Sequence, residues 1–322
     1  MRYSRLVSTG RALPRQLVTN EELARMHGLD TSDQWIVERT GIRTRYRAGP
    51  DENATTLGEA AARQALEMSA WAAEDLDLIV MGTTSSELMF PNSAVLLQAR
   101  LGIPGIPAFS VEAVCSGFLY ALSVADQFIR SGQARRVLVV GSETFSRFVD
   151  PKDRSTSILF GDGAGAVLLE AADEPGIMVT RLHADGRYAE LLYFPSGPGR
   201  NFRAMQHDYL IMQGSRVFKI AVQKLGDVLE ETLEAAHVTK EQIDWLVPHQ
   251  ANLRIIEALA HRLGLPMSRV VVTVDQHANT SSASVPMALD IAIRDGRIQR
   301  GDLVLLEAFG GGFTWGAALI RY

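Results

Sequence analysis

The sequence contains one cysteine, Cys115, in a setting where a thiol could act as a nucleophile. Residues 109–114 form a short, mostly apolar approach, and a helix is predicted after Ser116 and Gly117. The expected buried stripe of that helix consists of Phe118, Leu122, Ala125 and Ile129. Unpaired N–H groups and the helix dipole stabilise an anion at such an N-terminus, so we expect this thiol to ionise and attack more readily than a free one. The alternative is a small buried core residue, the usual fate of a lone cysteine.

Two other polar residues have the types that could assist a thiol. His249 follows an apolar strand predicted over 244–247 and then Pro248, and Asn279 lies in a loop rich in serine and threonine. Each has a plain structural explanation, because a histidine after a strand is often structural and an asparagine often caps the next helix. Their places in an internal repeat favour catalysis instead.

The chain contains two copies of one pattern of helices and strands. The paired segments lie 162 to 168 residues apart and occur in the same order: Leu57-Gly58 with Leu225-Gly226, 77–80 with 244–247, 101–104 with 263–266, and 129–132 with 293–296. We therefore predict two halves, 1–173 and 174–322. Apolar strands that alternate with helices indicate sheets buried on both faces. Two such halves packed together predict an α/β fold with the layers α/β/α/β/α.

The repeat also predicts where the reactive side chains meet. Asn279 lies 164 residues after Cys115, and His249 lies 167 residues after Gly82, which ends its own predicted strand. Positions related by the repeat come together at the seam between the halves, and the ends of buried strands at such seams form sites. We expect the cysteine, the histidine and the asparagine to converge there.

Two glycine-rich segments need separate interpretations. Gly310-Gly-Gly312 is either a tight turn or a backbone that brings an N–H close to a substrate oxygen, forming an oxyanion hole with the Cys115 N–H. The segment 161–165 superficially resembles a phosphate loop, but it leads into a strand, so a turn is favoured.

A basic helix face is expected beside the proposed site. The helix predicted over 252–264 carries Arg254, His261 and Arg262 on one face, and Lys219 can come from a neighbouring helix. Such a face is usually solvated surface. On an acidic protein it could instead dock an acidic partner.

Composition excludes several classes of protein. The chain has 322 residues, 47% hydrophobic and 21% charged, with a net charge of −5, so bulk attraction to nucleic acid or to an anionic membrane is not expected. One cysteine excludes an intrachain disulfide and a multi-thiolate metal site. Neither a signal core nor an apolar run of the ~20 residues needed to cross a bilayer is present. A cytoplasmic enzyme is the expectation.

Four motifs together resemble the β-ketoacyl-acyl-carrier-protein synthase III family, from Trp35 to the end of the chain. They are Val-Cys115-Ser-Gly-Phe, Val-Pro-His249-Gln-Ala-Asn-Leu-Arg254, His-Ala-Asn279-Thr-Ser and Glu-Ala-Phe-Gly-Gly-Gly-Phe-Thr-Trp-Gly. The resemblance implies the thiolase fold, a duplicated five-layer structure, and a homodimer. Ala278 and Val114 depart from it, since many members have glycine and alanine there.

The resemblance implies a role for each matching residue. Cys115 would be the acylated nucleophile, with its own N–H and that of Gly311 as the oxyanion hole, and His249 and Asn279 the decarboxylation pair. Coenzyme A would contact Trp35, Arg39 and Arg154. The carrier protein would contact Arg254, with Lys219, His261 and Arg262 beside it. Phe90 would reach across the dimer and limit the acyl pocket, and Phe309 would form an apolar wall against the malonyl carboxylate.

The implied reaction starts type II fatty acid synthesis. An acyl group, acetyl by default, passes from coenzyme A to Cys115. Malonyl-acyl carrier protein then loses CO2 and condenses with it to give 3-oxoacyl-acyl carrier protein. Coenzyme A thioester is a substrate, and neither a metal nor a redox cofactor is expected.

Three alternatives remain open at this stage. A related acyltransferase or condensing enzyme of secondary metabolism would use the same residues on another acceptor. A cysteine thioester hydrolase would also use Cys, His and Asn, with His249 as the base of the thiol. A noncatalytic interaction protein is the remote alternative. The residues do not determine which acyl chain starts the reaction.

Overall fold

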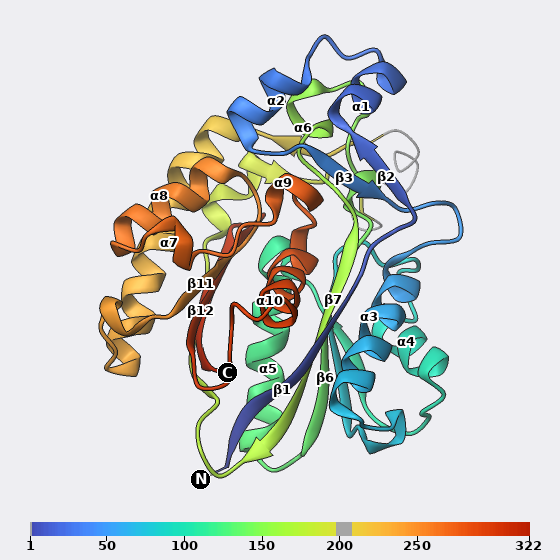
Figure 1. Ribbon diagram of the computed structural model, residues 1–322. Helices are drawn as coiled ribbons and strands as arrows, with labels where there is room; N and C mark the ends of the chain where they lie inside the picture. The colour runs from blue at the N-terminus through green and yellow to red at the C-terminus, as the bar shows by residue number, and fades with distance from the viewer. Residues whose placement is uncertain (1, 198–207) are drawn as a thin grey trace.

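The computed structural model describes residues 2–197 and 208–322 and is built around two mixed β-sheets (Figure 1). The first sheet has the strand order β1-β7-β6-β4-β5, and the second has the order β11-β12-β13-β8. The strands of the first are β1 (Tyr3–Ala12), β7 (Gly163–Ala172), β6 (Arg136–Glu143), β4 (Leu78–Gly82) and β5 (Ala108–Val111). Those of the second are β11 (Trp245–Pro248), β12 (Leu303–Gly310), β13 (Thr314–Arg321) and β8 (Ile177–Ala184).

The strand directions confirm the internal duplication. In the first sheet β1 is antiparallel to β7, β7 is antiparallel to β6, and β6 is parallel to β4. In the second sheet β8, β13, β12 and β11 repeat these relations in the same order. The counterpart of β5 is reduced to one parallel bridge between Leu246 and Val270. The predicted boundary at 173/174 falls between β7 and β8 and remains a prediction.

The helices form the other three layers, which confirms the predicted arrangement (Figure 1). Helices α5 (Gly117–Arg130) and α10 (Ser284–Arg294) lie between the sheets. Helices α3 (Ala54–Ser69) and α4 (Ser93–Leu101) cover the first sheet, and α7 (Gly214–Ala236) and α8 (Leu253–Leu263) cover the second. Within the described ranges, none of the helices combines the length and apolar character of a membrane span.

Shorter elements complete the fold around one end of the sheets. They are β2 (Gln16–Thr19), α1 (Asn20–His27), α2 (Asp33–Thr40), β3 (Thr44–Arg47), α6 (Arg154–Ser157), β9 (Leu192–Tyr193), β10 (Ile211–Met212) and α9 (Val274–His277). Helix α1 begins as its sequence predicts, because the Thr19 side chain accepts from the Glu22 N–H and the Glu22 carboxylate accepts from the Thr19 N–H.

Alternate residues of the central strands enter different cores. In β4, Leu78 and Val80 pack with the central helices, whereas Ile79 and Met81 pack under α3 and α4. Side chains alternate between the faces of a strand, so a strand covered on both sides must be apolar at every position. This explains the uninterrupted apolar runs in the sequence. The predicted stripe of α5 is buried in the central core.

The central layer depends on close packing of main chains. A Cβ added at Gly165 of β7 would lie 2.6 Å from the Met287 nitrogen and 2.7 Å from the Pro286 carbonyl carbon of α10. The helix backbone cannot yield as the end of a flexible side chain can, so only glycine fits at this contact.

We therefore expect Gly165→Ala to lower the free energy of unfolding by about 1–3 kcal/mol or more, because the new methyl group overpacks the core. Denaturant unfolding of the two proteins measures this difference. Gly186→Ala is the matched control, since nothing lies within 4 Å of a Cβ added there. Equal stability of both variants would contradict the packing argument.

Candidate active site

Cys115 lies where the sequence predicts it, in a short 3-10 turn (Val114–Ser116) between β5 and the N-terminus of α5. The turn is held by the Ser116 N–H, which donates to the Ala113 carbonyl at 3.1 Å. The Ser116 hydroxyl also lies 2.7 Å from Thr314 Oγ1 of the other half. Cys115 is only 4% exposed, so a substrate must enter the protein to reach the thiol.

One cavity of about 240 Å³ brings Cys115, His249 and Asn279 together. Phe309 lines the same cavity. The rest of the wall is largely apolar and comes from several elements: Phe145, Leu159, Phe160, Leu192, Met212, Val217, Phe218, Ala221, Leu225 and Ile255. The cavity is therefore a largely apolar pocket whose polar lining residues are the three predicted reactive residues with Ser155 and Asn252.

The second half of the chain holds the His249 ring. His249 directly follows β11, and its N–H donates to the Glu307 carbonyl at 2.9 Å. Its Nδ1 lies 2.5 Å from the Ser284 hydroxyl at the start of α10. This bond leaves Nε2 for the cavity. Burial lowers the pKa of His249 to about 3, so the imidazole is neutral at physiological pH.

Backbone bonds to the first half hold Asn279. Its N–H donates to the Leu159 carbonyl at 2.9 Å, and its carbonyl accepts from the Gly161 N–H at 3.0 Å. Its side-chain Oδ1 accepts from the Ser281 N–H at 2.9 Å, which leaves the amide NH2 group as a donor. The glycine-rich segment after Phe160 continues into β7. It is thus the predicted structural turn, and it helps to position Asn279.

The glycine turn after β12 lies against the nucleophile. A Cβ added at Gly310 would be 2.8 Å from the Cys115 nitrogen and 2.9 Å from the Ala113 carbonyl oxygen. The main chains of two distant segments therefore touch at the Cys115 amide. This placement suits an oxyanion hole, although the part assigned to the Gly311 N–H remains a prediction.

The predicted ionisation of Cys115 is wrong in direction for the resting protein. Burial raises the pKa of the Cys115 thiol to about 12, and the nearby Glu143 carboxylate adds to this increase. A hydrogen bond with the Ser281 side chain acts in the opposite direction. Desolvation of the thiolate outweighs the hydrogen bonds from the Ser281 side chain and the Cys115 backbone. The resting site holds a neutral thiol, which must lose its proton as it attacks.

Both predicted departures from the family pattern have strained backbones. Val114 has φ 46°, and Ala278 has φ 58° with ψ −158°. Few residues other than glycine adopt positive φ, and a β-branched residue there is unusual. Both residues adjoin a predicted catalytic side chain, so the surrounding structure must hold this strain in place.

The residues predicted to bind coenzyme A form one cluster. The guanidinium of Arg39 lies 4.2 Å from the centroid of the Trp35 ring, and that of Arg154 lies 4.6 Å from it. The Arg39 carbonyl accepts from Asn252 Nδ2, and Asn252 lines the cavity. The cluster thus adjoins the cavity that holds Cys115. Its role in binding remains a prediction.

The predicted carrier-protein residues differ in their surroundings. Arg254, Lys219 and His261 are exposed. Arg254 also donates to the Glu38 carbonyl at 2.8 Å, which ties this face to α2. Arg262 instead forms ion pairs with Asp227 and Glu230 of α7, so these carboxylates already partly neutralise its charge.

Phe90 lies outside the cavity that this chain encloses. Its side chain is 81% exposed, and the adjacent Leu88 and Met89 are 50% and 61% exposed. This apolar loop tip is where a residue that reaches a second subunit would lie. The role of Phe90 in the acyl pocket remains a prediction.

Sequence reasoning missed four residues that support the site: Glu143, Ser281, Ser284 and Glu307. Glu143 and Glu307 are fully buried, and burial raises their pKa values to about 7 and about 8. An acidic residue inside an otherwise apolar strand was the available signal, at Val-Gly-Ser-Glu143 and Leu-Leu-Glu307. The two serines belong to the same serine-rich segment as Asn279, where spacing along the chain does not distinguish them from neighbouring hydroxyl residues.

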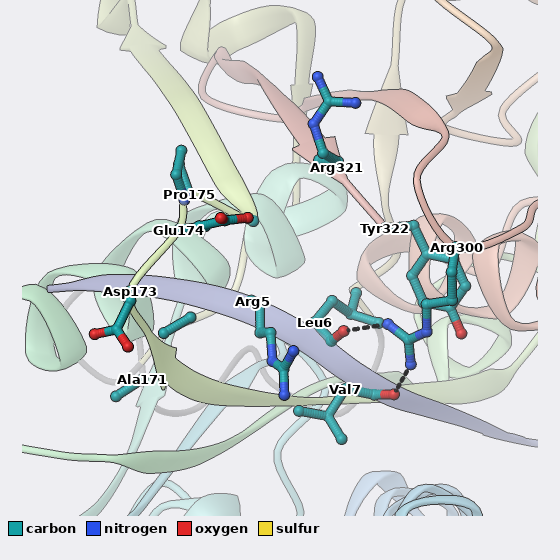
Figure 2. A pocket seen from close by; sticks show the side chains of 12 residues that line it. Arg5, Leu6, Val7, Ala171, Asp173, Glu174, Pro175, Arg300, Arg321 and Tyr322 are labelled. Carbon is teal, nitrogen blue, oxygen red and sulfur yellow. Dashed lines mark hydrogen bonds between the residues drawn. The ribbon is translucent and has the colours of Figure 1, made fainter.

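A second, larger hollow of about 750 Å³ shares no lining residue with the Cys115 cavity. It is lined by residues 5–7 of β1 and by the C-terminal residues Arg321 and Tyr322 (Figure 2). Its arginines are already engaged, since Arg300 donates to the Leu6 carbonyl at 2.8 Å and to that of Val7, and Arg321 donates to the Gly301 carbonyl. This hollow contains none of the three predicted reactive side chains.

Two repeated sheets around buried central helices define the thiolase-fold class of enzymes. The sequence matches two family models, "3-Oxoacyl-[acyl-carrier-protein (ACP)] synthase III" over residues 109–186 and its C-terminal model over 233–322. A β-ketoacyl-[acyl-carrier-protein] synthase III of Methylococcus capsulatus is 59% identical over 100% of this chain and 99% of its own length. The chain therefore belongs to the 3-oxoacyl-[acyl-carrier-protein] synthase III family.

Solved structures agree with this assignment. The 3-oxoacyl-[acyl-carrier-protein] synthase III of Aquifex aeolicus is 44% identical, with a TM-score of 0.93 over 99% of this chain and 100% of that one. A priming β-ketosynthase of the R1128 polyketide pathway is 38% identical, with a TM-score of 0.94 over 99% of this chain and 96% of that one. The chain is an acyltransferase of the condensing type.

The close contact between Gly310 and the Cys115 amide predicts how a methyl group added at Gly310 affects acylation of Cys115. Gly310→Ala would displace the Cys115 amide, so we expect acylation by acetyl-coenzyme A to slow by about 100-fold or more, as when an oxyanion donor is removed. Rapid-quench mass spectrometry of the protein measures the rate. Gly186→Ala serves again as the control. Unchanged acylation in Gly310→Ala would contradict the proposed geometry.

Glu307 predicts a pH dependence of stability. Its pKa is raised to about 8 in the folded protein, against about 4.3 in an unfolded chain. Between these values the folded state binds more protons, so the free energy of unfolding falls as pH rises. Glu307→Gln removes this contribution. One pKa unit corresponds to about 1.4 kcal/mol. From about pH 5 to about pH 8, the free energy of unfolding of the variant minus that of the parent should therefore increase by more than about 1 kcal/mol.

Denaturant unfolding of both proteins across this pH range measures the difference. The sign is specific, because the variant must become relatively more stable toward alkaline pH. Parallel stability curves for parent and variant would show that Glu307 does not carry a raised pKa in the folded protein.

Proposed function

We propose that this enzyme catalyses the initiating condensation of type II fatty acid synthesis, with Cys115, His249 and Asn279 as its reacting side chains. The observation that carries the proposal is the shared cavity, which joins the three residues within an apolar pocket. Relatives named β-ketoacyl-[acyl-carrier-protein] synthase III align with the whole chain at 54–59% identity, which supports the same reaction here.

In the first half-reaction, Cys115 sulfur attacks the thioester carbon of an acyl-coenzyme A. The thiol proton leaves as the carbon–sulfur bond forms, and the departing coenzyme A sulfur takes up a proton. The N–H groups of Cys115 and Gly311 hold the negative oxygen of the intermediate. Removing one such donor typically costs roughly 3 kcal/mol of transition-state stabilisation. The product is acyl-Cys115 and free coenzyme A.

In the second half-reaction, the thioester oxygen of malonyl-acyl carrier protein accepts hydrogen bonds from His249 Nε2–H and Asn279 Nδ2–H. Loss of CO2 leaves its electron pair as an enolate, which these donors stabilise. The enolate carbon attacks acyl-Cys115, a carbon–carbon bond forms, and Cys115 sulfur leaves as a thiolate, which takes up a proton from solvent to restore the resting thiol. Phe309 disfavours the malonyl carboxylate and favours its departure.

The state of the histidine supports this role. Ser284 Oγ accepts from the Gln250 N–H at 3.2 Å and lies 2.5 Å from His249 Nδ1. The serine proton can therefore be donated to Nδ1, which leaves the ring proton on Nε2. A ring with a pKa of about 3 donates hydrogen bonds without carrying a charge, so it stabilises the enolate and does not protonate it.

The substrates and the assembly belong to the same proposal. Coenzyme A thioester contacts Trp35, Arg39 and Arg154, and no metal or redox cofactor takes part. Arg254, with Lys219, His261 and Arg262 beside it, contacts the carrier protein. The enzyme acts in the cytoplasm as a homodimer in which Phe90 reaches the partner. The exposed position of Phe90 supports this last assignment.

A substitution series separates the two half-reactions. Incubation with acetyl-coenzyme A should add one acetyl mass to the peptide that contains Cys115. His249→Ala and Asn279→Ala should keep this acylation but slow condensation with malonyl-acyl carrier protein by about 100-fold or more, since each removes a donor to the enolate. Product mass and release of CO2 measure the second step.

The alternatives predict other results. A hydrolase would release free acid and form no carbon–carbon bond. A secondary-metabolism enzyme, favoured by the likeness to the R1128 priming β-ketosynthase, would prefer another starter or another acceptor in a panel of acyl-coenzyme A thioesters. Acetyl label on a residue other than Cys115 would overturn the central assignment.

A further inference from the structure

Glu143 joins the two halves of the molecule at the active site. It ends β6 and is fully buried. From the first half, its carboxylate accepts from the Ser85 N–H at 3.0 Å and from the Ser85 hydroxyl at 2.5 Å. From the second half, it accepts from the Ser282 hydroxyl at 3.1 Å and from that of Ser281 at 3.3 Å. The proposed reaction assigns no chemical step to this carboxyl group.

The second-half partners form a short turn, Ser281–Ala283, immediately after the Asn279 loop. Ser281 has φ 50°, a conformation that serine adopts only when its surroundings impose it. The turn is also seated against the first half. The Ser282 carbonyl oxygen would lie 2.3 Å from a Cβ added at Gly141, and Ser282 Oγ lies 2.8 Å from the Gly82 carbonyl.

This turn determines the orientation of the Asn279 side chain. The Ser281 N–H donates to Asn279 Oδ1 at 2.9 Å, so the NH2 group of the amide is the end that remains free to donate. A rotated amide would present its carbonyl oxygen to the thioester oxygen, and two acceptors repel. The Ser281 backbone must therefore stay in place for Asn279 to act as a donor.

We propose that Glu143 is a positioning residue for decarboxylation: it spans from the Thr84–Ser85 loop of the first half to the Ser281–Ser282 turn of the second, and so holds Asn279 with its NH2 group toward the thioester. The inference rests on the proposed donor role of Asn279. It adds a residue that touches no substrate and acts on the second half-reaction.

The length of the Glu143 side chain, and not its charge, is the property that this role requires. Burial raises the pKa of Glu143 to about 7, while hydrogen bonds from Ser85, Thr84 and Ser282 act in the opposite direction. A protonated carboxyl can still bridge the two segments, since Ser282 can accept its proton and donate its own to the Gly82 carbonyl. A side chain shorter by one methylene cannot reach both segments without moving one of them.

Two conservative substitutions separate reach from charge. Glu143→Gln keeps the length and loses the charge, and it should condense at no less than about one third of the parent rate. Glu143→Asp keeps the charge and loses the length, and it should slow condensation by about tenfold to a hundredfold, the effect of a misplacement of about 1 Å. Acylation by acetyl-coenzyme A should not slow by more than about threefold in either variant, because loss of the Glu143 charge can only ease removal of the Cys115 proton. Glu67→Gln, at an exposed position of α3, is the control for the substitution chemistry.

The separate assay of the two steps makes the outcomes distinct. Full activity of Glu143→Asp with loss in Glu143→Gln would overturn the proposal, because charge would then be the working property. Equal loss of acylation and condensation would assign Glu143 a general structural role and would overturn it too, as would wild-type rates in both variants.

Ser282→Ala keeps the inference testable where Glu143→Asp fails to fold. This variant removes a hydroxyl link to Glu143 and leaves in place both the Ser281 N–H and the Ser281 hydroxyl beside Cys115, so we expect slower condensation, by about threefold to tenfold, with acylation retained. Wild-type condensation in Ser282→Ala would overturn the proposal in that case. Failure of the proposed function itself would differ from all of these results, because the parent enzyme would then neither acylate Cys115 nor condense.

Discussion

The active site exists only where the main chains of the two halves touch. Gly310 of the second half lies against the Cys115 amide, and Gly141 of the first half lies against the Ser282 carbonyl. An added Cβ would be 2.8 Å and 2.3 Å from these atoms. Backbone contacts of this kind cannot be adjusted by side-chain rotation, so they hold the reacting groups more firmly than side-chain packing would. The duplicated fold supplies two such strand ends at one seam.

Burial has a second consequence, which is that the resting site carries little charge. Desolvation raises the pKa values of Cys115 and Glu307 and lowers that of His249. Each group is thereby favoured in its neutral form at physiological pH. In the proposed reaction, charge develops only on the oxygens of the substrates. Neutral hydrogen-bond donors that are already in place stabilise such a charge without first losing an ion-pair partner.

The surroundings of the cavity are basic, whereas its wall is largely apolar. Trp35 and two arginines adjoin the cavity through Asn252, and Arg254 lies on the same helix as the cavity residue Ile255. The wall around Cys115 is largely apolar. Under the proposed function, phosphate groups and the acidic carrier protein remain outside, while the uncharged arm of each thioester enters. This division avoids the cost of burying unpaired charge.

The sequence by itself determined the local elements, the duplication and the convergence of Cys115, His249 and Asn279. Hydrophobic periodicity, the capping pattern at Thr19 and a nearly constant repeat offset are properties of the linear chain, and each predicts its structure directly. Only the tertiary structure decided the protonation state of Cys115, the ion pairs of Arg262 and the place of Glu143 between the halves. These depend on how deeply a group is buried and on what a distant segment presents to it, and neither quantity is encoded by spacing along the chain.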